Sequence, residues 1–300
     1  MVKYSIGKGE LTMSKWSKVE EFLNMINIKE IFNQKFFLYG WEPGYEKIPT
    51  ENLGYIPFYD DKEMEIKVDI LPDDSPLKAN RKREATKYIT IHNTGMGHPT
   101  ATAKGLNEYI HTTTRVASWH FSIDDTETYQ QLKLDEVGWH AGDGHRTYQD
   151  RWVNDGYECI GGGNENSIGI ESCVYAGVDF IKVMRRLAKL TAMLLIKYDL
   201  GIEDVKQHYH FSGKNCPQVI REAHKWEEFL YLVKIEYFAQ TQLKGVKFVW
   251  KSLSPDILNN EGKVIFHPGV EKEVEYEVLV TMEDETKTFK FSSTLLERKD

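Results

Sequence analysis

The amino-acid sequence predicts an α/β domain in the middle of the chain and a small all-β module at its C-terminal end. Three observations lead to this prediction. Strand and helix signals alternate over residues 76–238, which is typical of one α/β layer domain. Residues 180–198 carry the strongest amphipathic helix pattern of the chain. From residue 241 onward, apolar and polar residues alternate with period two, as they do in strands with one buried face.

The strands of the α/β region are predicted where β-prone residues cluster. Residues 88–91 (Tyr-Ile-Thr-Ile) form such a run, which ends at His92. Residues 118–124 alternate large apolar and polar side chains, as a half-buried strand would. Residues 167–173 form a third candidate, and another short strand is expected near Val205.

Helices are expected between these strands. Residues 102–112 have helix character, and Pro217 opens a later helix at a position where proline is tolerated. The strongest helix, at residues 180–198, has apolar side chains at three- and four-residue spacing. These side chains are Phe180, Val183, Met184, Leu187, Leu190, Leu194, Leu195 and Tyr198.

The two ends of the chain have a different character. Residues 1–75 are predicted to be an N-terminal extension of unknown role, with a helix in the first half and loops in the second half, which is rich in Tyr, Pro, Gly and Asp. The helical spacing is that of Val19, Phe22, Leu23 and Ile26. Residues 241–300 are predicted to be the all-β module, with strands at 273–280, at 288–291 and around Phe248 and Trp250. The expected catalytic domain is residues 76–238.

Composition excludes several classes of protein. Hydrophobic residues make up 41% and charged residues 28% of the chain, which fits an ordinary globular protein. The net charge is −8 and no long basic run occurs, so a nucleic-acid partner is not expected. No apolar run is long enough to span a membrane. The N-terminus lacks the apolar segment of a signal peptide. The sequence does not indicate an oligomeric state.

A metal site is suggested by histidines and cysteines near the ends of strands. His92 ends one strand, His208 follows another, and Cys216 comes eight residues later. Two histidines and a thiolate can supply the three protein ligands of a catalytic zinc ion. The residues alone leave other sets open, such as His208 with His210 or His140 with His145, because the chain has 10 histidines and 3 cysteines.

Five motifs occur in an order that narrows these alternatives. They are Ile91-His-Asn-Thr, Ser118-Trp-His-Phe-Ser-Ile-Asp, Gly138-Trp-His-Ala-Gly-Asp-Gly, Asn166-Ser-Ile-Gly-Ile-Glu and His208-Tyr-His-Phe-Ser-Gly-Lys-Asn-Cys-Pro. Residues 80–235 thereby resemble type-2 N-acetylmuramoyl-L-alanine amidases, a family of phage endolysins and peptidoglycan recognition proteins. The resemblance implies a central mixed β-sheet flanked by helices.

The resemblance also implies roles for individual residues. His92, His208 and Cys216 match the zinc ligands of the family. Glu171 matches the general base for the attacking water, and Lys214 matches the cation that stabilises the oxyanion. From the residues alone, Glu171 could instead be a structural carboxylate and Lys214 an ordinary surface lysine.

Three further residues are expected near the substrate groove. The resemblance places His120, Trp139 and His140 there, as substrate-binding residues. The structural alternative is that Trp119 and Trp139 belong to the core, which is the commoner position of a large aromatic side chain. Some relatives have a tyrosine at the position of Trp119, and this departure leaves Glu171 as the main candidate base.

The expected function is zinc-dependent cleavage of the bond between N-acetylmuramic acid and L-alanine in bacterial peptidoglycan. The protein would be made in the cytoplasm of a bacterial or phage-infected cell and act at the wall after release or non-classical export. Alternatives are a non-catalytic peptidoglycan receptor, a cytosolic amidase that recycles anhydro-muropeptides, and an adhesion protein. The C-terminal module resembles small immunoglobulin-like domains of bacterial surface enzymes, which implies wall binding or spacing; a packing role without a ligand is the alternative.

Overall fold

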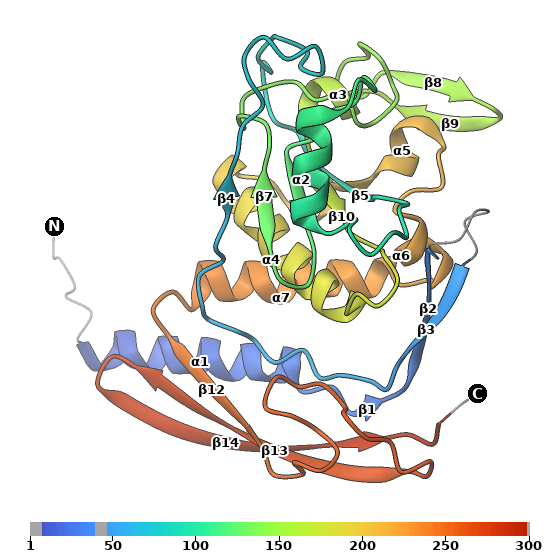
Figure 1. Ribbon diagram of the computed structural model, residues 1–300. Helices are drawn as coiled ribbons and strands as arrows, with labels where there is room; N and C mark the ends of the chain where they lie inside the picture. The colour runs from blue at the N-terminus through green and yellow to red at the C-terminus, as the bar shows by residue number, and fades with distance from the viewer. Residues whose placement is uncertain (1–7, 40–46, 299–300) are drawn as a thin grey trace, which may run out of the picture. The chain divides into compact units, whose positions relative to one another are not determined.

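The computed structural model describes residues 8–39 and 47–298 (Figure 1). The chain forms two compact units. The site unit comprises Lys35–Thr50 and Met64–Val233, and the terminal unit comprises Met1–Gln34, Glu51–Glu63 and Lys234–Asp300. This division differs from the expected ranges 1–75, 76–238 and 241–300, because parts of the N-terminal region share a hydrophobic core with the C-terminal strands.

The site unit is built on a six-stranded mixed sheet with the strand order β11-β5-β10-β6-β7-β4. Its strands are β4 (Lys67–Val68), β5 (Tyr88–Asn93), β6 (Phe121–Ile123), β7 (Thr128–Gln130), β10 (Ser167–Ser172) and β11 (Val205–Gln207). Strands β11, β5, β10 and β6 pair in parallel, and only β7 runs antiparallel to β6. The expected mixed sheet is therefore present.

The two faces of this sheet differ in chemistry, because side chains alternate along each strand. Ile89 and Ile91 of β5, and Ile168 and Ile170 of β10, share one face and are fully buried. Helix α4 (Phe180–Tyr198) contacts β5 and β6 and buries its apolar stripe. The opposite face carries His92 and the other polar side chains of the candidate site. The alternation thus separates the hydrophobic core of the unit from its chemistry.

Shorter elements surround the sheet. They are helices α2 (Ala103–Thr112), α3 (Gly163–Asn166), α5 (His208–Ser212) and α6 (Gln218–Glu222), the turn η1 (Ile202–Asp204), and the strand pairs β2–β3 (Gln34–Tyr39, Lys47–Asn52) and β8–β9 (Arg151–Asn154, Tyr157–Ile160). Helix α7 (Trp226–Gln242) continues from the site unit into the terminal unit. The expected helices at 102–112 and 180–198 are confirmed. The expectation of loops in the second half of residues 1–75 is wrong at β3 and β4.

The terminal unit contains a four-stranded sheet with the order β1-β14-β13-β12. Its strands are β1 (Glu30–Ile31), β12 (Lys247–Ser252), β13 (Lys272–Met282) and β14 (Glu285–Leu295). Strands β12, β13 and β14 pair antiparallel, and β1 joins β14 in parallel. The strands expected around Phe248 and Trp250, at 273–280 and at 288–291, are therefore present.

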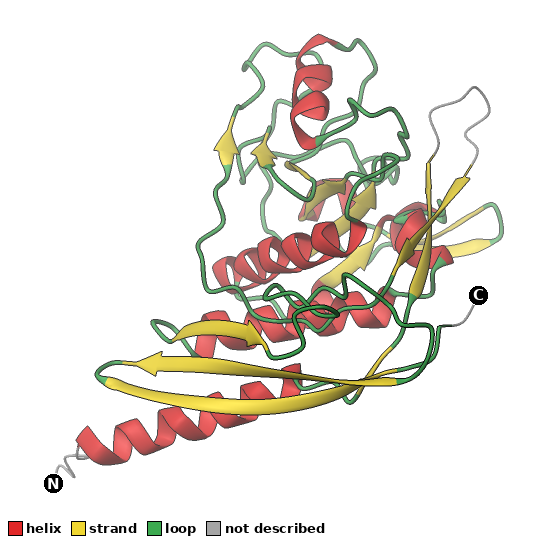
Figure 2. Ribbon diagram, turned by 60° about the horizontal axis from the view of Figure 1, so that its bottom comes forward, coloured by secondary structure: helices red, strands yellow, loops and turns green. Residues whose placement is uncertain are grey.

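One face of this sheet packs against helix α1 (Lys8–Ile26), as Figure 2 shows beside β13 and β14. Phe22 and Ile26 of α1 and Tyr276 and Val278 of β13 are among the buried side chains of this core. The C-terminal strands are thus covered by a helix, and the described residues of this unit form one sheet. An all-β, sandwich-like or immunoglobulin-like module is not confirmed.

Candidate active site

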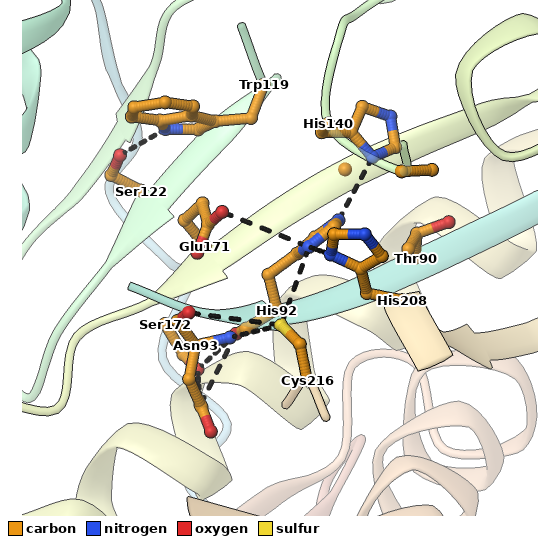
Figure 3. A network of polar contacts seen from close by, with 12 residues as sticks. Thr90, His92, Asn93, Trp119, Ser122, His140, Glu171, Ser172, His208 and Cys216 are labelled. Carbon is orange, nitrogen blue, oxygen red and sulfur yellow. Dashed lines mark hydrogen bonds and ion pairs between the residues drawn. The ribbon is translucent and has the colours of Figure 1, made fainter. Parts of the chain in front are cut away.

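The site unit brings His92, His208 and Cys216 together (Figure 3). One ligand atom from each residue lies within 4.8 Å of the other two, and all three side chains are buried. Nδ1 of His92 is 3.0 Å from Nδ1 of His208 and 3.8 Å from the sulfur of Cys216. Over the described ranges, this is the one cluster of three side chains suited to hold a metal ion.

Two of the three residues meet because His92 lies near the end of one strand and His208 directly follows another at the same edge of the sheet. His92 is the fifth residue of β5, and His208 begins α5 directly after β11. These two strands pair in parallel, so their carboxyl ends lie side by side. Cys216 lies in the turn between α5 and α6. The carboxyl edge of a parallel sheet is a common place for a functional site.

Asn93 connects the parts of this cluster (Figure 3). Its backbone N–H donates to the Cys216 sulfur at 3.4 Å, and its side-chain oxygen accepts from the Val219 N–H in α6 at 2.8 Å. Its side-chain nitrogen donates to Ser172 Oγ at 2.6 Å, and Ser172 Oγ donates to the His92 carbonyl at 2.6 Å. Strands β5 and β10 and helix α6 are therefore fixed relative to one another at the site.

Burial sets the protonation of the three candidate ligands. It lowers the pKa of His92, and nearby histidines lower it further. Burial, followed by the charge of Lys214, lowers the pKa of His208 to about 3. Burial raises the pKa of the Cys216 thiol to about 12, and the negative charge of Glu171 adds to this rise. Two neutral imidazoles and a neutral thiol therefore face one another in the protein alone.

This donor set fits zinc. Catalytic zinc ions take three protein ligands, commonly histidine nitrogen and cysteine sulfur, and leave one position open. A buried thiol with a raised pKa becomes a thiolate when a cation lies beside it. Neutral imidazoles already have the lone pair that a metal requires. We therefore expect zinc to be held by His92, His208 and Cys216.

Glu171 is the acidic residue nearest to this cluster. It is paired with His92 across β10 and β5, and its Oε1 lies 3.9 Å from Nδ1 of His92. Its Oε2 is buried and has no hydrogen-bond partner among the described residues. Burial raises the pKa of Glu171 to about 7, against the opposing charges of Lys214 and Arg115. A carboxyl group with such a pKa can take up and release a proton near neutral pH.

Lys214 lies in the turn between α5 and α6, two residues before Cys216, and its side chain is exposed. Its positive charge lowers the pKa values of His92, His208 and Glu171. The ammonium group is therefore close enough to act electrostatically on the whole cluster. Its role as an oxyanion-stabilising cation stays a prediction.

His140 contacts a candidate ligand directly. Its Nδ1 lies 3.0 Å from Nε2 of His92, and burial lowers the pKa of His140 to about 3. Its ring packs against Gly169 of β10, where a Cβ atom would lie only 2.7 Å from the ring. The backbone N–H of His140 donates to Asn164 Oδ1 at 2.9 Å. Hydrogen bonding of this kind orients a metal-binding histidine, so its placement adds a positioning role to the expected substrate contact.

His120 lies deeper in the protein. Its ring is fully buried, and Nδ1 accepts from the Gly169 N–H at 3.1 Å. Nε2 lies 3.0 Å from the Glu136 carbonyl and 2.9 Å from Nη1 of the buried Arg83. Both ring nitrogens are thus occupied within the protein. This placement favours a structural role for His120 over the expected contact with substrate.

The two tryptophans of the motifs lie in different environments. Trp119 is buried and donates from Nε1 to Ser122 Oγ at 2.7 Å, as expected for a core residue. Trp139 is half-buried, with the His145 ring 5.2 Å away at its edge and the Arg81 guanidinium 5.5 Å from its ring. Part of the Trp139 side chain is accessible to a ligand, and substrate contact by this residue stays a prediction.

Sequence reasoning gave no role to Asn93, Ser172 or Arg115, which the structure places in or near the site. Asn93 and Ser172 belong to the His-Asn-Thr and Glu-Ser-Cys segments of the motifs, so their positions beside predicted site residues were the available signal. Arg115 lies in an irregular segment after α2 and carries no sequence signal of this kind.

The fold and the cluster define the class of this protein: an α/β protein with a candidate His–His–Cys metal centre at the carboxyl edge of its sheet. Residues 82–219 match the N-acetylmuramoyl-L-alanine amidase family. The chain is 33% identical to a mutant endolysin from Bacillus subtilis of known structure, covering 99% of that chain and 57% of this one with a TM-score of 0.50. The chain therefore belongs, through its site unit, to the N-acetylmuramoyl-L-alanine amidase family.

Two curated relatives from Bacillus subtilis (strain 168) are similar over the same region. The N-acetylmuramoyl-L-alanine amidase XlyA is 36% identical over 54% of this chain and 50% of its own length. The N-acetylmuramoyl-L-alanine amidase CwlH is 36% identical over 49% of this chain and 52% of its own length. The chain thus spans about half the length of these relatives. In the described part of the chain, no helix has the length and apolar character needed to cross a membrane.

Proposed function

We propose that this protein hydrolyses the amide bond between N-acetylmuramic acid and L-alanine in bacterial peptidoglycan, with zinc as its cofactor. The proposal rests on one observation above all. His92, His208 and Cys216 gather within 4.8 Å of one another, beside a carboxyl group whose pKa is raised to about 7. Amide hydrolysis needs an activated water, a proton carrier and a stabilised oxyanion, and these residues provide a candidate for each.

Zinc bound by the three ligands would act as a Lewis acid. Glu171 performs the proton transfers in the proposed reaction. Its carboxylate accepts a proton from the attacking water and then donates this proton to the amino group of L-alanine as the amide bond breaks. Its Oε2 atom is buried and has no hydrogen-bond partner among the described residues, so no protein group competes for its proton. A raised pKa suits both steps, because the group must accept and release a proton at the same pH.

Lys214 acts on the substrate oxygen. As water attacks the lactyl carbonyl of muramic acid, negative charge develops on the carbonyl oxygen. The ammonium group of Lys214 stabilises this charge, and a fixed cation beside a developing oxyanion lowers the reaction barrier. The electrostatic effect of Lys214 on the clustered histidines supports this role.

The partner in this proposal is the bacterial cell wall. Release from the cytoplasm or non-classical export would bring the protein to it, and the terminal unit would contribute wall binding or spacing. A receptor without catalysis and an amidase that recycles anhydro-muropeptides are the competing functions. The Cys216 ligand opposes the receptor, because loss of this cysteine would be the simplest way to lose the metal.

The test is to incubate zinc-loaded protein with purified peptidoglycan and to identify the products by mass spectrometry. We expect peptides with a free N-terminal L-alanine and no new reducing sugar ends. Intact wall together with tight binding to peptidoglycan would refute the enzyme and favour a receptor. Cleavage of soluble anhydro-muropeptides without cleavage of intact wall would favour the recycling amidase.

A further inference from the structure

The turn that connects two candidate ligands also carries Lys214. Helix α5 begins at His208 and ends at Ser212, and Gly213 then adopts a left-handed backbone conformation with φ of +73°. The Gly213 N–H donates to the Tyr209 carbonyl at 2.8 Å. Lys214 and Asn215 follow before Cys216. Any movement of this turn would therefore displace the Lys214 ammonium group relative to the ligands.

The side chain of Lys214 does not fix its own position. It is exposed, and its ammonium group makes no hydrogen bond or ion pair with the residues that the structure describes. A lysine side chain is long and flexible, and its charge alone does not hold it in one orientation. The backbone of the turn therefore sets where this side chain begins, and with it the region that the ammonium group can reach.

A hairpin from a distant part of the sequence contacts this turn. Strands β8 and β9 pair antiparallel, with Asn154 opposite Tyr157. Asp155 and Gly156 between them have φ values of 53° and 85°. Two left-handed residues in a two-residue loop are the pattern of a tight, twisted hairpin turn. Figure 1 shows β9 beside α5 in the site unit, and these two elements are in contact.

Two side chains of the hairpin hold the turn directly. Asn154 donates from Nδ2 to the Ser212 carbonyl at 2.7 Å, at the last residue of α5. The Tyr157 ring covers Gly213, where a Cβ atom would lie 3.1 Å from it. The same ring meets the Tyr209 ring of α5 edge to face at 5.3 Å. The hairpin thus fixes both the end of α5 and the left-handed residue that redirects the chain toward Lys214.

The other side of the turn is held by helix α6. The Arg221 guanidinium lies over the Tyr209 ring at 3.7 Å, and its Nε donates to Asn215 Oδ1 at 2.8 Å. Asn215 also donates to Glu222 Oε1 at 3.1 Å. The turn is therefore enclosed between the hairpin and α6. The hairpin is a two-stranded sheet of its own and does not pair with the six-stranded sheet.

We propose that the β8–β9 hairpin is a positioning element for catalysis, in which Asn154 and Tyr157 hold the turn that directs Lys214 at the substrate oxygen. This inference rests on the proposed function, because it takes Lys214 as the oxyanion-stabilising cation. Asn154 and Tyr157 are positioning residues: they act through the turn and need not contact substrate. A displacement of about 1 Å in a catalytic group can lower a rate by up to about 100-fold.

The experiment compares paired variants at these two exposed positions. Asn154→Asp keeps the shape of the side chain and removes the N–H donor, whereas Asn154→Gln keeps a donor. Tyr157→Ala removes the ring from Gly213, whereas Tyr157→Phe keeps it. Glu158→Gln is the matched control, because Glu158 is on the same hairpin and pairs with Arg151 at 3.6 Å, away from the turn. The readouts are kcat and KM on solubilised peptidoglycan, bound zinc, and amide hydrogen exchange in residues 213–215.

We expect Asn154→Asp and Tyr157→Ala to lower kcat about tenfold, to change KM by less than about twofold, and to speed amide exchange in the turn. Asn154→Gln, Tyr157→Phe and Glu158→Gln should stay close to the parent, and all five variants should retain zinc. Unchanged kcat and exchange in Asn154→Asp and Tyr157→Ala would overturn the inference. Loss of zinc in proportion to kcat would also overturn it, since the hairpin would then act on the metal ligands.

The two proposals fail in different ways. If the parent protein does not cleave peptidoglycan, the proposed function is wrong, and the exchange measurement still decides whether the hairpin holds the turn. If the parent cleaves peptidoglycan and the paired variants do not differ, only the positioning inference is wrong.

Discussion

The two larger sheets of the molecule both alternate apolar and polar side chains along their strands, but only one of them carries a candidate site. In the site unit, one face of β5 and β10 is apolar, and the other carries the buried His92 and the partly buried Glu171, whose side chain is 17% exposed. In the terminal unit, one face of β12 and β13 is apolar, and the other is exposed, with a salt bridge of 3.4 Å between Lys251 and Glu277. Period-two alternation alone therefore does not indicate a site.

The difference lies in burial and in strand direction. Parallel strands bring their carboxyl ends, and the side chains there, to one edge of a sheet. The covered polar face then keeps Glu171 from most of the solvent, which raises its pKa to about 7. On the exposed antiparallel face, charged side chains pair with their cross-strand neighbours in water, where such pairs contribute little energy. Ionisable side chains with shifted pKa values are typical of functional sites, and burial without a full set of hydrogen-bond partners produces such shifts.

Removal of a candidate metal ligand should have the largest effect on activity. We expect Cys216→Ser to lose stoichiometric zinc and to lower kcat/KM by at least about 1000-fold, because a hydroxyl group is a poor zinc ligand beside two histidines. Bound zinc by mass spectrometry and product release from peptidoglycan measure the two effects. Cys159→Ser is the matched control, since Cys159 is also buried but lies outside the cluster. Equal losses in both variants would contradict the assignment.

Replacement of Glu171 should have the second largest effect on activity. Glu171→Gln keeps the size of the side chain and removes the proton carrier, so we expect kcat to fall about 100- to 10,000-fold while zinc remains bound. Glu277→Gln on the exposed sheet face should leave kcat unchanged. A Glu171→Gln variant with full activity would show that this residue is structural.

The same substitution should change the pH dependence of stability in the metal-free protein. The pKa of Glu171 is raised in the folded state from 4.5 to about 7, so its favourable contribution is present below pH 4.5 and is lost as the pH rises through about 7. Glu171→Gln should therefore gain stability relative to the parent over this range, by up to about 3 kcal/mol. Urea denaturation at pH 4.5 and pH 7.5 measures this, and parallel pH profiles would contradict it.

Substitutions on the covered face of the terminal sheet should lower the stability of the protein. Val278 is fully buried against the core that includes helix α1. Val278→Ala should lower the free energy of unfolding by about 2 kcal/mol through lost burial and a small cavity. The midpoint of chemical denaturation reports this change. A shift no larger than that of an exposed-face variant would contradict the packing of α1 on this sheet.

The smallest effect is expected on the exposed face of the same sheet. Lys251→Met breaks the ion pair with Glu277, in which the Lys251 side chain is 65% exposed. We expect the free energy of unfolding to change by less than about 0.5 kcal/mol, because solvent screens such pairs. A loss above about 1 kcal/mol would show that solvent does not screen this ion pair.

Much of the site unit follows from the sequence. The β-prone run Tyr88-Ile-Thr-Ile predicts β5 with His92 at its end, and the apolar stripe predicts α4. The motif order predicts the grouping of His92, His208 and Cys216. The contacts of His140 and His120 could not be predicted in this way, because they depend on Gly169 of a neighbouring strand and on the register between strands.

Other elements were missed for identifiable physical reasons. The β8–β9 hairpin has short strands with mixed polarity, and its Asp155–Gly156 turn signal was the available indication. Strand β3 has Pro49 and polar side chains, which gives it a weak strand pattern. The packing of α1 on the C-terminal strands joins residues more than 220 positions apart, and local patterns carry no information on such pairings.

The parallel pairing of β1 with β14, which joins Glu30 to Thr294 and Ile31 to Leu295, has a consequence for the order of events during synthesis. Residues 64–233 are contiguous, and domains that are complete in sequence can fold while the ribosome is still working. The terminal unit cannot close until its last strand has been translated. Helix α1 is synthesised well before these strands, so its apolar face stays uncovered until they arrive, and nascent chains should need protection from aggregation around this helix.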